Sequence, residues 1–472
     1  MTYSLPQSLR WRRAAVTGLV VGLALAVALL VAEAHRRHAL YWYDARQDYV
    51  YDFGAGHSAV LPVQPRHDGF LLPEWDARHH TAFLRLRVSS SPGGWWFEPC
   101  IEMRAGKASE QQCFERGAKG VRYLLLPTAA DRPGREITLR GHHIEWDAGS
   151  AKVVLFDSPD FTNKRLLVLA PHPDDAEIAA FGLYSTQDSF VVTMTAGNYV
   201  DGLYDHLRVD RSAQDALRGD VRTWDSLVVP QWGGVPPERS VNLGYLTNSL
   251  QTFYEAATSA SAPPDAAGKP VGRYRQGAVQ ELLGGRTATA TWDSVVQDLV
   301  TVLATARPDF IVAPHPAMDA AADHQYTTVA LLAALEQLHD DRTTLLLYTN
   351  HHVLAEYFPF GPSDAMVTLP PWFGGVRFDS VYSHALDSAA QLRKLFALEA
   401  MHDLRAPPLR LTGGPGTVLA QRLQQAAELL RRDPAGDYSY FRRAVRPNEL
   451  FFVYPPGERE PLESFLKSQL MH

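Results

Sequence analysis

The chain has 472 residues, of which 46% are hydrophobic and 21% charged, and 45 Lys and Arg against 52 Asp and Glu give a formal net charge of -7. This length predicts two or three domains, and the composition excludes a disordered, collagen-like or multi-spanning membrane protein. The slight acidity offers no basic field for nucleic acid, and the 2 cysteines are too few for a disulfide-rich scaffold or a four-cysteine zinc site.

The N-terminal region contains an uncharged, apolar run over residues 14–32. As a helix it would be about 28 Å long, close to the thickness of a hydrocarbon core. More arginines precede the run than follow it, which favours a cytoplasmic N-terminus. We therefore expect residues 1–38 to form a cytoplasmic tail and a single-pass signal-anchor in the inner (cytoplasmic) membrane, with the rest periplasmic or otherwise extracytoplasmic. A signal peptide cleaved near Ala32-Glu33-Ala34 and a buried core helix are the alternatives.

Residues 39–160 have the pattern of a β-sandwich-like accessory domain. Short apolar runs, separated by Gly, Pro, Ser or Asp, predict strands at residues 82–90, 94–103, 121–127, 136–141 and 151–157.

Two features of this region bear on function. Cys100 and Cys113 flank a polar turn between two expected strands, so in an oxidising compartment we expect a hairpin disulfide, with two buried thiols as the alternative. Trp95 and Trp96 could line a sugar-binding face, whereas a sandwich-core tryptophan beside a partly exposed neighbour is the more ordinary role.

Residues 161–472 alternate continuous apolar runs with helical stretches, which predicts a Rossmann-like open parallel sheet of the α/β class. The expected strands are residues 165–171, 190–197, 226–230, 309–315, 343–350 and 449–454. The expected helices are residues 176–185, 211–224, 294–306, 328–338, 389–404 and 418–432. Residues 256–285 are rich in Ala, Pro and Gly and are typical of a long insertion loop.

A His-Pro-Asp-Asp motif follows the strand at residues 165–171. Ligands bind at the carboxyl ends of strands in such sheets. His172 and Asp175 are three residues apart and can converge on one ion at a helix start, while Asp174 stays free to act as a base. If the strand at residues 309–315 lies alongside, His324 completes a His/Asp/His set, which is typical of catalytic zinc. A motif standing alone would instead be an ordinary strand-to-helix turn with an aspartate cap.

Together the two motifs resemble those of the LmbE/PIG-L family of zinc-dependent N-acetyl-sugar deacetylases. Residues 171–177 match the family's (A/P)HPDD-x-E motif. The second family motif is matched by His315, Pro316, Asp319, Asp323 and His324. The resemblance covers roughly residues 164–454 and leaves out the β-rich region.

The resemblance implies that His172, Asp175 and His324 hold Zn²⁺, or another divalent metal, and that Asp174 is the general base. It also suggests a substrate contact from one of three arginines, Arg208, Arg211 or Arg218, of which Arg218 is the best placed. Where many family members have an acidic residue, this chain has Asn198, which could hydrogen-bond a sugar hydroxyl, with an ordinary turn-forming asparagine as the alternative. The function implied is a membrane-anchored N-deacetylase acting on an N-acetyl amino sugar of the GlcNAc type in a glycan, glycolipid or exported polysaccharide.

The chain departs from the family at Ala321, where an additional histidine is usual. A substitute is expected among four histidines: His351, His352, His384 and His402. Hydrolysis of a small thiol-glycoside or a non-sugar amide is a second possibility. The alternative from another class is a glycan-binding or scaffold protein with a weakened deacetylase-like site.

Overall fold

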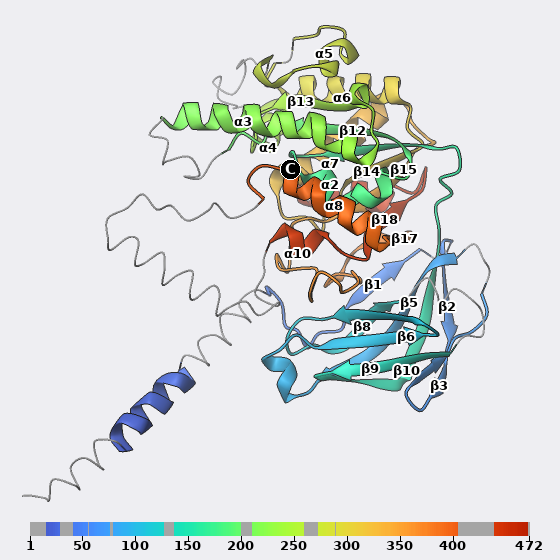
Figure 1. Cartoon of the computed structure of the whole chain (residues 1–472). Helices are drawn as coiled ribbons and strands as arrows, with labels where there is room; N and C mark the ends of the chain where they lie inside the picture. The colour runs from blue at the N-terminus through green and yellow to red at the C-terminus, as the bar shows by residue number, and fades with distance from the viewer. Residues whose placement is uncertain are drawn as a thin grey trace, which may run out of the picture.

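The computed structural model describes residues 16–28, 41–54, 56–75, 79–126, 136–199, 210–258, 272–287, 289–404 and 439–470. The described chain combines antiparallel sheets, built from its N-terminal third, with a helix-covered sheet built from the remainder (Figure 1).

The expected membrane anchor is only partly described. Residues 16–28 form a helix with exposed side chains. Within the described residues, no helix combines the length and the apolar character needed to cross a membrane. The expected span of residues 14–32 extends beyond this helix at both ends, so the anchor stays a prediction.

The β-rich region forms two antiparallel sheets. The first has the strand order β2-β10-β5-β8, with bounds Ser58–Pro62, Ile144–Asp157, His79–Ser90 and Lys119–Leu125. The second has the order β3-β4-β9-β6-β7, with bounds Gln64–Arg66, Gly69–Leu71, Glu136–His142, Cys100–Ala105 and Ala108–Cys113. Alternate apolar side chains of both sheets, among them Leu84 and Ile101, meet in one core. The two sheets therefore pack face to face.

The hairpin of β6 and β7 confirms the expected disulfide. Cys100 and Cys113 lie directly opposite each other in the ladder, with their Cα atoms 4.0 Å apart, and are bonded. The strand expected from residue 94 is wrong at its start, because the short helix η1 (Pro92–Trp95) precedes β6. Trp95 and Trp96 are exposed on this turn and do not belong to the sandwich core.

Residues 165–454 contribute a mixed sheet with the order β13-β12-β11-β14-β15-β18-β17. The strand bounds in that order are Ser240–Tyr245, Asp188–Thr195, Arg165–Ala170, Phe310–Pro314, Thr344–Tyr348, Asn448–Tyr454 and Ser380–Ala385. β13 to β15 are parallel, whereas β18 pairs antiparallel with both β15 and β17. The sequence predicted an all-parallel sheet, and this prediction is wrong at one edge, where β18 lies antiparallel between β15 and the edge strand β17.

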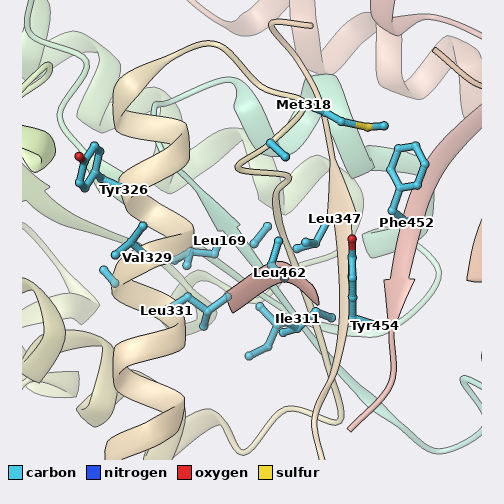
Figure 2. Close-up of a cluster of buried hydrophobic side chains, with 14 of the residues drawn as sticks. Leu169, Ile311, Met318, Tyr326, Val329, Leu331, Leu347, Phe452, Tyr454 and Leu462 are labelled. Atoms are coloured by element: carbon cyan, nitrogen blue, oxygen red, sulfur yellow. The ribbon is translucent and has the colours of Figure 1, made fainter. Parts of the chain in front are cut away.

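Helices cover both faces of the mixed sheet, which explains the unbroken apolar runs of its strands. One face packs on α4, α6, α7 and α11, with bounds Leu250–Thr258, Trp292–Ala306, Ala322–Gln337 and Glu460–Gln469. The other face packs on α2 and α8, with bounds Asp175–Tyr184 and Ser388–Ala400. Figure 2 shows the first core, where strand side chains meet those of α7: Leu169, Ile311 and Leu347 lie near Tyr326, Val329 and Leu331.

Two expectations from the sequence are wrong here. Residues 226–230 are not a strand, because α3 (Arg211–Val228) continues to Val228 and η4 (Val229–Gly233) follows, while the fully buried β13 takes the sheet position. The expected insertion loop is partly helical, since α4 runs into it and η7 (Gly272–Tyr274) and α5 (Ala278–Leu282) follow. The helix expected at residues 418–432 lies outside the described residues.

The sandwich also packs on the mixed sheet. The outer face of its first sheet, including Phe83 and Phe156, belongs to the same core as Phe452 of β18. In addition, β1 (Val50–Phe53) pairs in parallel with β16 (Phe373–Phe378). Because these contacts run across residue 160, the division into domains at 39–160 and 161–472 stays a prediction.

Candidate metal centre and substrate pocket

The two motifs meet because β11 and β14 are adjacent, parallel strands. Leu166 of β11 lies opposite Phe310 of β14, and the pairing continues from there toward the carboxyl ends. Their carboxyl ends therefore open at the same edge of the sheet. His172 follows β11 directly, and His324 lies in the first turn of α7, after β14. The strand order thus satisfies the condition for a shared site.

His172, Asp175 and His324 form a candidate metal centre. Each offers one ligand atom, and the three atoms lie within 4.8 Å of one another. Asp175 Oδ2 is 3.2 Å from His172 Nδ1 and 3.1 Å from His324 Nε2. Two imidazoles and one carboxylate around a single point suit zinc and several other divalent metals.

The buried polar atoms of His324 fit a bound cation. The side chain is fully buried, yet neither ring nitrogen has a hydrogen-bond partner of acceptable geometry. Buried polar groups in native proteins are nearly always satisfied, and a metal at Nε2 would satisfy this one. Behind the ligands, Asp319 Oδ2 lies 3.1 Å from His324 Nδ1, and Asp323 Oδ2 lies 3.0 Å from His172 Nε2. Carboxylates behind the imidazoles are the usual outer support of such a site.

The charges of the site favour an anionic Asp175. Burial alone would raise the pKa of this carboxyl, but the imidazoles of His324 and His172 outweigh it and hold the pKa well below its usual range. Asn350 Nδ2 also donates to Asp175 Oδ1 at 2.8 Å. For His172, burial is outweighed by hydrogen bonds to Asp175 and Asp323, which raise its pKa to about 8.

Asp174 is placed differently from Asp175. It precedes α2 with a φ of 120°, a conformation that costs a non-glycine residue about 1–3 kcal/mol and is found at functional sites. Burial raises the pKa of Asp174, against the opposing charge of Arg222. Arg222 Nη2 lies 2.9 Å from Asp174 Oδ2 and also donates to the Pro173 carbonyl. A strained, buried carboxyl with a raised pKa is suited to accept a proton.

Arg222 was not singled out from the sequence. The available signal was its spacing from Arg218, because residues four apart share one face of a helix. Both arginines come from α3 and both line the pocket beside the metal centre.

The metal centre opens into a pocket of about 470 Å³, within the range of small-molecule sites. Its lining also includes Tyr199, Arg218, Asp403 and Tyr440. Arg218 Nε donates to Asp403 Oδ2 at 2.7 Å, and Nη1 donates to the Tyr199 carbonyl. Polar groups around a pocket of this size are suited to hydroxyl-bearing ligands.

The other expected substrate contacts are placed elsewhere. Asn198 is not among the pocket-lining residues, and its side-chain oxygen accepts from Thr247 N at 2.9 Å. Arg211, at the start of α3, lies 3.5 Å from Asp215. Arg208 lies outside the described residues. Among the proposed arginines, the pocket geometry therefore favours Arg218.

Of the four histidines considered in place of Ala321, His351 lines the pocket. Its ring centroid is 5.0 Å from that of His324. Tyr440 Oη lies 3.2 Å from its Nε2, and Glu356 Oε1 lies 3.1 Å from its Nδ1. Tyr440 is distant in sequence, and no local pattern marks it.

The other three histidines, all described, are occupied elsewhere. His352 is buried and its Nδ1 accepts from Leu354 N, His384 lies against the Tyr382 hydroxyl, and His402 pairs with Asp225.

No protein-family model and no curated protein matches the chain. Among solved structures, the chain is similar to the A40926 pseudoaglycone deacetylase Dbv21, at 16% identity and a TM-score of 0.32 over 62% of this chain and 98% of that one. It is also similar to the zinc-inhibited form of teicoplanin deacetylase Orf2, at 17% identity and a TM-score of 0.34 over 62% of this chain and 99% of that one. A third neighbour is GalB, the 4-carboxy-2-hydroxymuconate hydratase from Pseudomonas putida KT2440, at 14% identity and a TM-score of 0.30 over 62% of this chain and 97% of that one. Likeness at this level assigns no activity.

Proposed function

We propose that the chain is a metal-dependent N-deacetylase that hydrolyses the acetamide of an N-acetyl amino sugar, of the GlcNAc type, in a glycan, glycolipid or exported polysaccharide. Residues 14–32 would anchor it in the inner membrane, with the enzyme on the extracytoplasmic side. One observation carries the proposal: a buried acid, Asp174, lies beside a His/Asp/His set at the wall of a sugar-sized pocket.

His172, Asp175 and His324 would hold a divalent ion, which when bound supplies Lewis acidity and lowers the pKa of water to about 7. Asp174 would accept a proton from the water whose oxygen attacks the acetamide carbon. The same proton would then pass to the amide nitrogen as the carbon–nitrogen bond breaks, so that acetate and a free amine are released. Arg222 would keep the Asp174 carboxyl aimed into the pocket through its 2.9 Å contact.

His351 would take over the role of the histidine that the family has at the position of Ala321. It would donate a hydrogen bond to the acetamide oxygen as negative charge develops there, an interaction typically worth 10²–10³-fold in rate. The Nδ1 contact with Glu356 supports this by holding the ring at the pocket wall, and Nε2, which lies beside the Tyr440 hydroxyl, is the nitrogen that would turn to the acetamide oxygen.

The test measures zinc binding by the full chain and amine release from N-acetyl-chitooligosaccharides. Replacing the base, Asp174→Asn, should lower amine release by about 10²–10⁴-fold while leaving zinc bound. His172→Ala should remove both. Asp225→Asn is the matched control, because this buried carboxylate on α3 pairs with His402 and is not among the pocket-lining residues.

Two results would contradict the proposal. One is amine release that persists in both Asp174→Asn and His172→Ala. The other is binding of acetylated glycans without any amine release, with zinc present, which would favour the glycan-binding alternative.

A further inference from the structure

Three consecutive aromatic residues are exposed at one end of the sandwich. The relative exposures of Trp95, Trp96 and Phe97 are 48%, 41% and 56%. Trp95 is the last residue of η1, and Trp96 and Phe97 follow it in the connection between β5 and β6. We refer to residues 95–97 as the aromatic turn. Contiguous exposed apolar residues, unlike singly scattered ones, are candidates for a contact site.

The aromatic turn is held rigidly by its backbone. Trp96 N and Phe97 N both donate to the Gly93 carbonyl, at 3.0 and 2.9 Å, and Gly117 N donates to the Gly94 carbonyl at 2.8 Å. A Cβ at position 94 would lie 2.6 Å from the His143 carbonyl, so this close approach requires glycine. The fold therefore holds the backbone of the aromatic turn in one position.

The turn lies close to the start of the described body of the chain. Arg116 N donates to the Tyr41 hydroxyl at 3.3 Å, and Arg116 Nε donates to the Trp96 carbonyl at 3.2 Å. One residue thus connects Tyr41 with the aromatic turn. The neighbouring Trp42 is also exposed, at 71%.

The length of the connecting chain limits how far this end can lie from a membrane. Residues 33–40 separate the expected anchor from Tyr41. Even fully extended, they reach only about 28 Å. The Tyr41 end of the body must therefore remain near any bilayer that the anchor enters.

We propose that the aromatic turn lies in the headgroup zone of the membrane that holds residues 14–32, and that this contact orients the protein on the bilayer. Tryptophan prefers this zone because its ring is apolar and its indole N–H is polar. Phe97 adds an apolar ring without a hydrogen-bonding group, which suits lipid better than sugar. The inference rests on the proposed anchor but not on the proposed chemistry.

The experiment uses the full chain in lipid nanodiscs made either with phosphatidylcholine brominated on its upper acyl carbons or with the unbrominated lipid. Bromine quenches nearby tryptophan fluorescence. Trp95→Phe/Trp96→Phe keeps the aromatic surface and removes two fluorophores. The matched control is Trp224→Phe/Trp232→Phe, since these tryptophans on α3 and η4 are 61% and 58% exposed.

The expected loss of quenched intensity in Trp95→Phe/Trp96→Phe is about half, because the other tryptophans expected to be quenched are Trp11 and Trp42, which flank the expected anchor in the sequence. The control should lose none. Undiminished quenching in Trp95→Phe/Trp96→Phe, with the chain still eluting with the discs, would overturn the aromatic contact and leave the anchor standing.

Two further outcomes are decisive. A chain that elutes without discs overturns the anchor and the contact together. Emission from Trp95 and Trp96 that responds to N-acetyl-chitooligosaccharide but not to brominated lipid overturns the lipid contact in favour of a glycan platform.

Discussion

The carboxylate behind His324 offers the sharpest test of the metal centre. Asp319 is fully buried. Its Oδ1 accepts from Ala321 N at 3.1 Å, and its Oδ2 accepts from Asn350 N at 2.9 Å and His351 N at 3.1 Å. The same Oδ2 faces His324 Nδ1 at 3.1 Å. Asp319→Asn keeps the shape and removes the charge.

The consequence can be estimated from these contacts. The amide oxygen would keep the Oδ2 position, where the backbone N–H groups of Asn350 and His351 donate and the His324 ring lies 3.1 Å away. The amide nitrogen would then face Ala321 N–H, leaving a buried donor unpaired at a loss of about 1–3 kcal/mol in unfolding free energy. Without a negative charge behind it, His324 becomes a weaker ligand. Mutation of a carboxylate that supports a metal-binding histidine typically lowers metal affinity by 10–100-fold. That corresponds to about 1.4–2.7 kcal/mol of binding free energy.

The assay is zinc binding in competition with a chelator, paired with urea unfolding of the same samples. Asp298→Asn is the control: this carboxylate is equally buried and contacts Arg275, Arg286 and the Tyr245 hydroxyl. It should lose stability and keep wild-type zinc affinity. Wild-type zinc affinity in a folded Asp319→Asn would refute the orienting role, and an equal affinity loss in Asp298→Asn would point to general loosening.

Three further predictions concern catalysis and stability. His351→Ala should lower kcat for amine release by about 10²-fold with KM and zinc affinity little changed, and His351→Gln should recover part of it; unchanged kcat in the alanine variant would exclude the proposed hydrogen bond. Burial lowers the pKa of both His315 and His352 to about 3. At these two sites the unfolded chain therefore binds more protons than the folded chain between pH 6.5 and 3, so each histidine contributes a fall in unfolding free energy of about 1.4 kcal/mol per pH unit on acidification through this window. Burial raises the pKa of Glu177 to about 8, which contributes in the opposite direction above pH 4.5, so the histidine share is read from the difference between wild type and His315→Gln. Urea unfolding at pH 7, 6 and 5 checks the slope, which should shrink in His315→Gln. Arg122 and Glu115 form a fully buried ion pair, so Arg122→Met should cost about 3–5 kcal/mol and Arg122→Met/Glu115→Leu less; equal thermal stability of the single and double variants would count against an unpaired buried charge.

Local spacing in the sequence was enough to predict several parts of this molecule. His172 and Asp175 approach each other because a strand end and the first helical turn bring residues three apart together. The disulfide between Cys100 and Cys113 follows from a hairpin whose strands flank a short polar turn. Continuous apolar runs identified most strands of the mixed sheet, since strands covered on both faces carry no alternation.

Where the local pattern of apolar residues is ambiguous, the sequence did not predict the type of an element or its direction in the sheet. Residues 226–230 have a strand-like composition but complete α3 and begin η4, because packing against neighbours decides between helix and strand for short apolar runs. The antiparallel position of β18 is likewise invisible locally. It depends on which strand edge the returning chain meets.

The meeting of His324 with His172 and Asp175 was predicted only on the condition that β11 and β14 are neighbours, and strand order is a property of the whole sheet. Arg222 and Tyr440 reach the pocket from α3 and from α10 (Tyr440–Ala444), and His351 from the end of β15. The sequence by itself thus determined the site residues that lie within one motif, such as His172 and Asp175. Groups that approach from distant segments were decided by the tertiary structure, because their contacts depend on how helices and strands pack and not on spacing along the chain.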